Sequence, residues 1–270
     1  MPRHGFRLRG NFLLKEYSKR GSFLREEAAL LVLKPHPFIS ELHASFKTEL
    51  KNGKFSGVLQ LKYYQGCDLH GWIDNYKHGS PIKFVRYVFK KVLLAYDYAA
   101  RHSIYHRDIK PENIMLDETG MLKLIDWELC SFKRYSSRRV GTVEYMSEEV
   151  NNGELYDCKK SDIWSLGVVI FCLASGVRPY DSINPDSCDE WINAIYEKRW
   201  IKFWRSHEHK KKFPSLSYDF KFCIENMLKQ EPEERSNLED IMTSSFLNGD
   251  EMKRSEIVAR LEFCTFNSLF

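Results

Sequence analysis

The stretch HRDIKPENIMLDETGMLKLIDWELC, residues 106–130, constrains this chain more than any other part of its sequence. It opens with a carboxylate, Asp108, followed two residues later by the cation Lys110 and five residues later by the amide Asn113. In a tight extended loop these three side chains can face one cavity. Apolar runs on both sides of a Glu-Thr-Gly turn then predict a short hairpin, after which Asp126 adds a second carboxylate.

These residue types are the ones that phosphoryl transfer requires. The reaction needs a carboxylate to orient an acceptor hydroxyl, a fixed cation to offset moving charge, and a divalent metal to hold the phosphates. Asn113 and Asp126 together make a hard oxygen site suited to Mg²⁺. Each residue alone has an ordinary interpretation as a turn, cap or surface residue. The combination at this spacing is specific, and it predicts a phosphoryl-transfer site.

The N-terminal part of the chain, residues 11–62, predicts short strands around one helix. The segment NFLLKEYSK is strand-like, and GVLQLKYY returns to strand because it is rich in Val, Leu and Tyr. Between them, FLREEAALLVL repeats apolar residues at helical spacing, namely Leu24, Ala28, Leu31 and Val32.

From about residue 68 the chain is predicted to be helical. The segment PIKFVRYVFKKVLLAYDYAARH has the apolar periodicity of an amphipathic helix. SDIWSLGVVIFCLASG is apolar on most faces, which indicates a central buried helix. We therefore expect the α+β class, with a small β-rich N-lobe, a larger α-helical C-lobe and a hinge at YYQGCD.

Composition excludes several classes of protein. The seven cysteines include no CxxC pair, which argues against a disulfide framework or a zinc site and suits a reducing compartment. The first residues lack the apolar core of a signal peptide, and the longest uncharged apolar run, 163–177, is too short to span a bilayer. A net charge of +4 is too small to indicate nucleic-acid binding. We expect an intracellular, cytoplasmic protein, with the nucleus left open.

HRDIKPEN resembles the catalytic loop of eukaryotic protein kinases, and the resemblance extends from about residue 11 to about residue 248. The lysine in DIK is similar to the serine/threonine branch. GTVEYM, residues 141–146, resembles the substrate-facing loop of that branch, in which Thr142 would hydrogen-bond near Asp108 and Lys110. The segment after the buried helix looks most like the calcium/calmodulin-dependent kinase group.

The resemblance implies a two-lobed protein kinase-like fold. It assigns an incomplete N-lobe to residues 1–64, a C-lobe to 65–250 and a tail to 251–270. It also implies ATP and Mg²⁺ as cofactors, proteins with Ser or Thr acceptors as substrates, and an upstream activating kinase as a possible partner.

Roles follow by resemblance for the catalytic residues. Asp108 would position the acceptor hydroxyl and take its proton, Lys110 would steady the γ-phosphate, and Asn113 with Asp126 would hold Mg²⁺. Lys15 in FLLK matches the strand lysine that contacts the α- and β-phosphates.

Glu27 matches the helix glutamate that pairs with this lysine, because EAALLVLKPHPFI fits the family's run from that glutamate. The gap from Lys15 to Glu27 is on the short side, so Lys19 is the alternative to Lys15.

The segment LKYYQGCDL matches the hinge of the family. Leu61 falls at the gatekeeper position, and Lys62 and Tyr64 would offer backbone groups to adenine. Asp68 would reach the ribose or a substrate residue, and Met115 is expected to line the nucleotide site.

Further matches are structural. Asp162 would anchor the backbone of the catalytic loop, and Glu149 would form a buried ion pair with Arg235. An apolar spine joining the lobes is expected from Leu31, Leu42, His106 and Trp127.

Three departures from the family pattern predict impaired activity. No Gly-x-Gly-x-x-Gly hairpin precedes Lys15, so the N-lobe looks truncated. Glu128 replaces a glycine, where it should resist the backbone angles that glycine tolerates and place a third carboxylate near the metal. SEE, residues 147–149, replaces Ala-Pro-Glu.

Two hypotheses therefore remain, a weak serine/threonine kinase and a pseudokinase that acts as a binding or scaffolding module. A small-molecule phosphotransferase is disfavoured by GTVEYM. Arg107 makes Ser136 and Ser137 candidate activating phosphosites, with two ordinary loop serines as the alternative. Glu112 and Asp68 could favour basic residues ahead of the acceptor.

Overall fold

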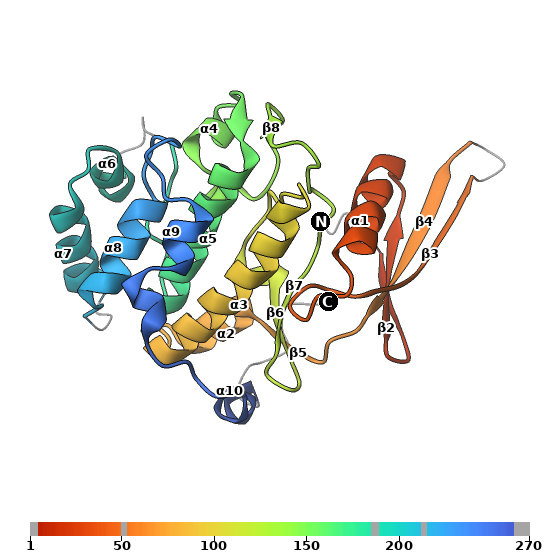
Figure 1. Cartoon of the computed structure of the whole chain (residues 1–270), viewed down its shortest axis with the longest axis horizontal. Coiled ribbons are helices and arrows are strands. Elements are labelled where there is room, and N and C mark those ends of the chain that lie inside the picture. The colour runs from red at the N-terminus through yellow and green to blue at the C-terminus, as the bar shows by residue number, and fades with distance from the viewer. Residues whose placement is uncertain (1–4, 50–52, 185–188, 212–214, 262–270) are drawn as a thin grey trace.

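The computed structural model describes residues 5–49, 53–184, 189–211 and 215–261. These residues form a smaller lobe built on a β-sheet and a larger, mainly helical lobe (Figure 1). The chain crosses between the lobes at residues 63–65. The predicted α+β fold with this division of strands and helices is confirmed. The boundary at residue 64 falls within this connection and stays a prediction.

The smaller lobe is a four-stranded antiparallel sheet, in the order β1-β2-β4-β3, with one helix packed on it. Lys15 lies in the second strand, where it is paired with Leu59. The elements are β1 (Phe6–Arg9), β2 (Phe12–Tyr17), α1 (Arg20–Leu33), β3 (Leu42–Glu49) and β4 (Phe55–Lys62).

Helix α1 turns a different face to the sheet from the one its spacing indicated. Leu24, Leu31 and Val32 are 38%, 49% and 46% exposed, whereas Phe23 and Leu30 are buried. Apolar residues lie on both sides of this helix, so periodicity alone does not select a face. The sheet selects it, because the Phe23 ring packs against Tyr17 and Phe55.

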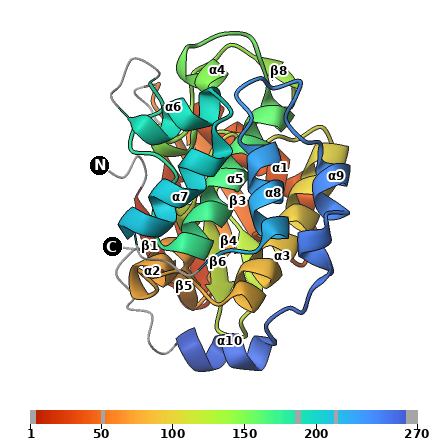
Figure 2. The same ribbon diagram turned by 90° about the vertical axis from the view of Figure 1, so that its left-hand side faces the viewer.

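The larger lobe is built around α5, which is buried along most of its length, as predicted (Figure 2). It contacts α2, α3 and α8. The helices of this lobe are α2 (Leu69–Asn75), α3 (Ile82–Arg101), α4 (Glu148–Asn151), α5 (Cys158–Ser175), α6 (Glu190–Tyr196), α7 (Trp200–Lys211), α8 (Tyr218–Met227), α9 (Leu238–Met242) and α10 (Arg254–Leu261).

A small sheet at the base of the larger lobe carries the predicted hairpin. Its order is β5-β6-β7, from strands β5 (Gly66–Asp68), β6 (Ile114–Asp117) and β7 (Leu122–Leu124). Gly120 sits in the turn with φ of 74°, a left-handed conformation that glycine adopts without strain. The hairpin brings Asp126 back to the loop that contains Asn113, since Ile125 N donates to the Asn113 carbonyl at 3.0 Å.

The chain after residue 250 continues the packing of the larger lobe as far as it is described. Glu251 pairs with Lys90 and Lys91 of α3, and the buried Ile257 of α10 lies beside Gly120. No helix among the described residues combines the length and the apolar character that crossing a membrane requires.

Candidate active site

The catalytic loop is anchored to the central helix. The buried Asp162 of α5 accepts backbone hydrogen bonds from His106 at 2.8 Å and Arg107 at 2.7 Å, so the predicted anchor is present. Burial raises the pKa of Asp162 to about 7, although the two backbone N–H groups favour its charged form. Arg107 has φ of 64°, which these contacts hold in place. The loop is therefore positioned by the core of the larger lobe.

Four predicted residues meet at the end of this loop. The Thr142 hydroxyl donates to Asp108 Oδ1 at 2.8 Å and accepts from Lys110 Nζ at 2.9 Å. Lys110 Nζ lies 3.1 Å from Asp108 Oδ2. Asn113 Nδ2 donates to the Asp108 carbonyl at 2.8 Å. A hydroxyl is thus held between a carboxylate and a cation, as general-base activation of an acceptor requires.

Lys15 belongs to strand β2 of the smaller lobe and lines the cavity between the lobes. Its Nζ is 2.7 Å from Glu26 Oε2, 2.6 Å from Asp126 Oδ1 and 3.9 Å from Glu128 Oε2. Burial would lower the pKa of Lys15, but the charges of Glu26 and Asp126 raise it above its usual value. Burial would likewise raise the pKa of Asp126, yet Lys15 holds that pKa at about 2. Three carboxylates therefore surround one buried ammonium group.

The predicted pairing of Lys15 with Glu27 is wrong, because the structure pairs Lys15 with Glu26. The Glu27 carboxylate instead accepts from Ser45 Oγ at 2.6 Å and Lys47 Nζ at 3.4 Å. Neighbouring residues point about 100° apart on a helix, so a one-residue error in register sends the side chain elsewhere. Lys19, the alternative to Lys15, is exposed ahead of α1.

The same one-residue error affects the apolar spine. Leu42, His106 and Trp127 are buried as expected, but Leu31 points outward and Leu30 is buried in its place. The rings of His106 and Trp127 lie 4.6 Å apart between centroids. This contact joins the catalytic loop to the segment that follows Asp126.

A cavity of about 170 Å³ between the lobes joins the hinge to Lys15. Its lining is mostly apolar and includes these predicted residues: Lys15, Leu61, Lys62, Tyr64, Asn113, Met115 and Asp126. Sequence reasoning missed Phe6, Leu13 and Glu26. Leu13 could have been predicted, because it lies two residues before Lys15 in the same strand. Residues two apart in a strand point to the same face of the sheet.

Asp68 does not line this cavity. It is buried, and its carboxylate caps α2 by accepting from Gly71 N at 2.8 Å. An aspartate directly before a helix is a favoured N-cap. The Asp68 carboxylate is used for this cap, so the predicted contact with a ribose is not supported.

Glu128 adopts a backbone conformation that suits it. Its φ is not positive, so the expected strain is absent, and the left-handed residue is Asp126 with φ of 61°. Cys130 N donates to the Trp127 carbonyl at 3.1 Å, which places Glu128 second in a turn where most residues are tolerated. The third carboxylate expected near the metal ligands is present beside Lys15.

The oxygens near Asp126 fit a magnesium ion. The amide nitrogen of Asn113 is used inside the loop, which leaves its Oδ1 for a cation, and the Asp126 carboxylate is 37% exposed. No group of three His, Cys, Asp or Glu residues in the described chain could hold a metal by itself. This agrees with Mg²⁺ chemistry, in which one or two carboxylates bind the ion together with phosphates.

The turn between β1 and β2 contacts the hinge. Its Asn11 carbonyl accepts from Tyr63 N at 3.0 Å, which places it beside the hinge.

The segment from Ser136 to Glu149, which carries the candidate phosphosites, is held at both of its ends. Arg235 Nη1 lies 2.9 Å from Glu149 Oε1 in the predicted buried ion pair. Arg107 Nη1 donates to Ser136 Oγ at 2.9 Å, whereas Ser137 is exposed.

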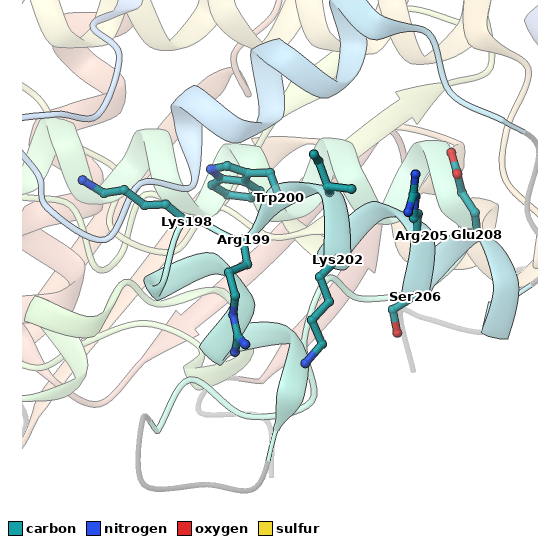
Figure 3. Close-up of a pocket in the computed structure, with 8 residues that line it drawn as sticks. Lys198, Arg199, Trp200, Lys202, Arg205, Ser206 and Glu208 are labelled. Atoms are coloured by element: carbon teal, nitrogen blue, oxygen red, sulfur yellow. The ribbon is translucent and has the colours of Figure 1, made fainter.

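Another hollow of the described surface lies along the start of α7 (Figure 3). Its labelled side chains are mainly basic, including Lys198, Arg199, Lys202 and Arg205. It lacks the paired carboxylate and hydroxyl of the Asp108 cluster, so it is not the candidate active site.

Residues 13–247 match the family model described as protein kinase domain. CBL-interacting protein kinase 5 of Oryza sativa subsp. japonica is 31% identical over 169 residues, 60% of this chain and 35% of the relative. CBL-interacting protein kinase 9 of the same organism is 32% identical over 192 residues, 65% and 41%. CBL-interacting serine/threonine-protein kinase 20 of Arabidopsis thaliana is 31% identical over 167 residues, 60% and 36%.

The chain thus spans well under half the length of these curated relatives. The family model, in contrast, covers most of the chain. The chain belongs to the protein kinase family.

Proposed function

We propose that this chain transfers the γ-phosphate of ATP to serine or threonine hydroxyls of protein substrates, with Mg²⁺ as the metal. One observation carries the proposal, namely the Thr142 hydroxyl held between the Asp108 carboxylate and the Lys110 ammonium. The serine/threonine kinases among its relatives support the same choice of acceptor.

Asp108 is the candidate base in this scheme. Its carboxylate already accepts a hydroxyl hydrogen bond, so it can orient an acceptor hydroxyl and take its proton. Lys110 places positive charge beside the same point, where negative charge moves during transfer. When bound, ATP supplies the phosphoryl group and Mg²⁺ offsets the charge on its phosphates.

The remaining roles belong to the cleft between the lobes. Leu61 and Met115 supply apolar surface for adenine, and the backbone of Lys62 and Tyr64 can provide hydrogen bonds. Lys15 would contact the α- and β-phosphates. Asn113 and Asp126 would hold the metal.

Acidic side chains near Thr142 support a substrate with a basic residue beside the acceptor. A cavity of about 270 Å³ is lined by Asp74 and Glu112, and by Glu144, which lies 3.8 Å from Arg178 of the same lining. Glu112 Oε2 is buried and has no hydrogen-bond partner among the described residues, so a guanidinium or ammonium group would satisfy it. Asp68, the other acid expected here, is occupied as a helix cap. Cys172 lines the same cavity.

Arg107 and Ser136 support regulation by phosphorylation. Burial lowers the pKa of Arg25, and the nearby charges of Arg138 and Arg107 lower it further. A phosphate on Ser136 would meet the guanidinium group of Arg107, which already donates to Ser136 Oγ. An upstream kinase would supply it. We expect the Ser136→Ala/Ser137→Ala double variant to lose turnover, and undiminished turnover would contradict this regulation.

An intracellular location belongs to the same proposal. The cysteines that the structure describes are buried and form no disulfide, which suits a reducing compartment. The cytoplasm, with the nucleus as the alternative, remains part of the proposal.

The deciding experiment measures γ-phosphate transfer from ATP with Mg²⁺ to a generic basic protein. Asp108→Asn is the control, because it keeps the shape of the side chain and removes the base. We expect incorporation by the native chain and almost none by the variant. Equal signals from the two proteins would contradict the kinase proposal.

One observation favours the second candidate, a pseudokinase that acts as a binding module. The carboxylates around Lys15 oppose the entry of phosphates. A thermal shift with Mg-ATP distinguishes the two, since stabilisation without transfer would indicate a nucleotide-binding module.

A further inference from the structure

The charges around Lys15 do not balance. One ammonium group faces the carboxylates of Glu26, Asp126 and Glu128, and Lys15 and Glu26 are almost completely buried. Glu128 is also nearly enclosed, with its side chain 9% exposed. Charges in such surroundings interact more strongly than they do in water.

A second observation shows the same shortage of positive charge. Lys15 Nζ and the Tyr17 hydroxyl both donate to one oxygen of Glu26, Oε2. The other oxygen, Oε1, is buried without a hydrogen-bond partner among the described residues. An unsatisfied buried carboxylate oxygen is costly, and a further cation nearby would relieve it.

Glu128 adds the third negative charge beside Lys15. Its position in an unstrained turn holds the side chain beside Lys15, and Arg25 Nε fixes the turn by donating to the Glu128 carbonyl at 2.9 Å. A nucleotide phosphate that approaches Lys15 therefore meets a fixed negative charge that competes for the same ammonium group.

We propose that Glu128 couples nucleotide binding to a divalent cation, by competing with phosphate for Lys15 and so rejecting ATP that carries no metal. This proposal rests on the proposed function, because it assumes that ATP phosphates approach Lys15. Glu128 acts through Lys15 and is a positioning residue. A cation held at Asp126 offsets the Glu128 charge, since both carboxylates lie close to the same nitrogen atom.

The test compares the affinity for ATP in excess EDTA with the affinity in excess Mg²⁺, measured by calorimetry on the full chain. Glu128→Gln removes the charge and keeps the size of the side chain. We expect this variant to bind metal-free ATP about tenfold more tightly than the native chain, from the Coulomb energy of one charge at protein dielectric. We expect Mg-ATP binding to change by no more than about threefold, because the metal offsets the charge.

Glu27→Gln is the matched control. It removes the same charge one position from Glu26, but its carboxylate contacts Ser45 and Lys47. Its preference for Mg-ATP over ATP should equal that of the native chain. Glu128→Gly is a second variant at the site, and thermal melting without nucleotide shows that each variant is folded.

The outcomes separate the two proposals. If the native chain binds Mg-ATP and both Glu128 variants keep its preference for Mg-ATP, the coupling role is overturned while the proposed function stands. If none of these proteins binds ATP with or without Mg²⁺, the proposed function fails and the coupling role fails with it.

Discussion

Two charged clusters of the candidate site, which we call the catalytic-loop end and the nucleotide end, differ in how their charges are balanced. At the catalytic-loop end, Lys110 lies beside one carboxylate, Asp108, and the Thr142 hydroxyl bridges them. At the nucleotide end, Lys15 lies among three carboxylates. Contacts with the core of the larger lobe hold the first end in place. Under the function that we propose, the second end needs added positive charge before phosphates can approach Lys15.

The largest expected effect comes from one substitution at each end. Asp108→Asn should lower phosphoryl transfer by about 10³-fold, because general-base catalysis is lost, and should leave Mg-ATP binding unchanged. Lys15→Met should weaken Mg-ATP binding as well as transfer. Steady-state kinetics with ATP titration and calorimetry separate the two effects.

Lys19→Met is the control for this comparison, because Lys19 is exposed outside the cleft. If it impairs nucleotide binding as strongly as Lys15→Met does, the placement of the phosphate contact at Lys15 is wrong.

The pairing of Lys15 is tested by two neighbouring glutamates. Glu26→Ala removes a charge-assisted hydrogen bond to Lys15 and should lower kcat/KM for ATP by about tenfold or more. Glu27→Ala should stay within about twofold, because its partners are Ser45 and Lys47. The same loss in both variants would contradict the observed register of α1.

Substrate selection should respond to a substitution at Glu112. Glu112→Gln should lower kcat/KM by about tenfold for peptides with an arginine ahead of the acceptor, since one hydrogen bond to a charged group is weakened. Peptides without a basic residue are the internal control and should be unaffected. A uniform loss on both peptides would show that Glu112 supports the loop and does not select the substrate.

The smallest expected effect is the dependence of stability on pH. It differs between Asp162, which anchors the catalytic-loop end, and Asp126 at the nucleotide end. The pKa of Asp162 is raised to about 7 in the folded chain, so its contribution to stability is full below its usual pKa and is lost as pH rises through about 7. The pKa of Asp126 is lowered to about 2, so its contribution is lost only in acid.

The stability advantage of the native chain over Asp162→Asn should therefore shrink between about pH 4 and pH 8. Urea unfolding of both proteins across this range measures it. An advantage that grows with pH would contradict the raised pKa.

Sequence reasoning located the catalytic-loop end well, because its residues lie in one short segment. Asp108, Lys110 and Asn113 span six positions, and the core helix that anchors them carries its own recognisable Asp162. The spacing of residues along the chain is enough to predict that side chains lie together when those residues belong to the same loop.

The nucleotide end was less predictable, because its contacts join separate elements. Glu26 and Glu27 are both acids on one helix, and only the packing of Phe23 against the sheet decides which one faces Lys15. The prediction for Asp68 failed for a similar reason, because its carboxylate caps the start of α2 and does not line the cavity between the lobes.

The sequence by itself determined the family, the α+β division into two lobes and the grouping of Asp108, Lys110 and Asn113 in one loop, because these depend on short-range patterns of residue type. Only the tertiary structure decided that Glu26 pairs with Lys15, that Glu128 lies in an unstrained turn, and that its carboxylate joins two others around one ammonium group. The physical reason is that rotation of a helix and the path of a turn are set by packing between elements, and a change of one residue in register redirects a charge into or out of the cleft.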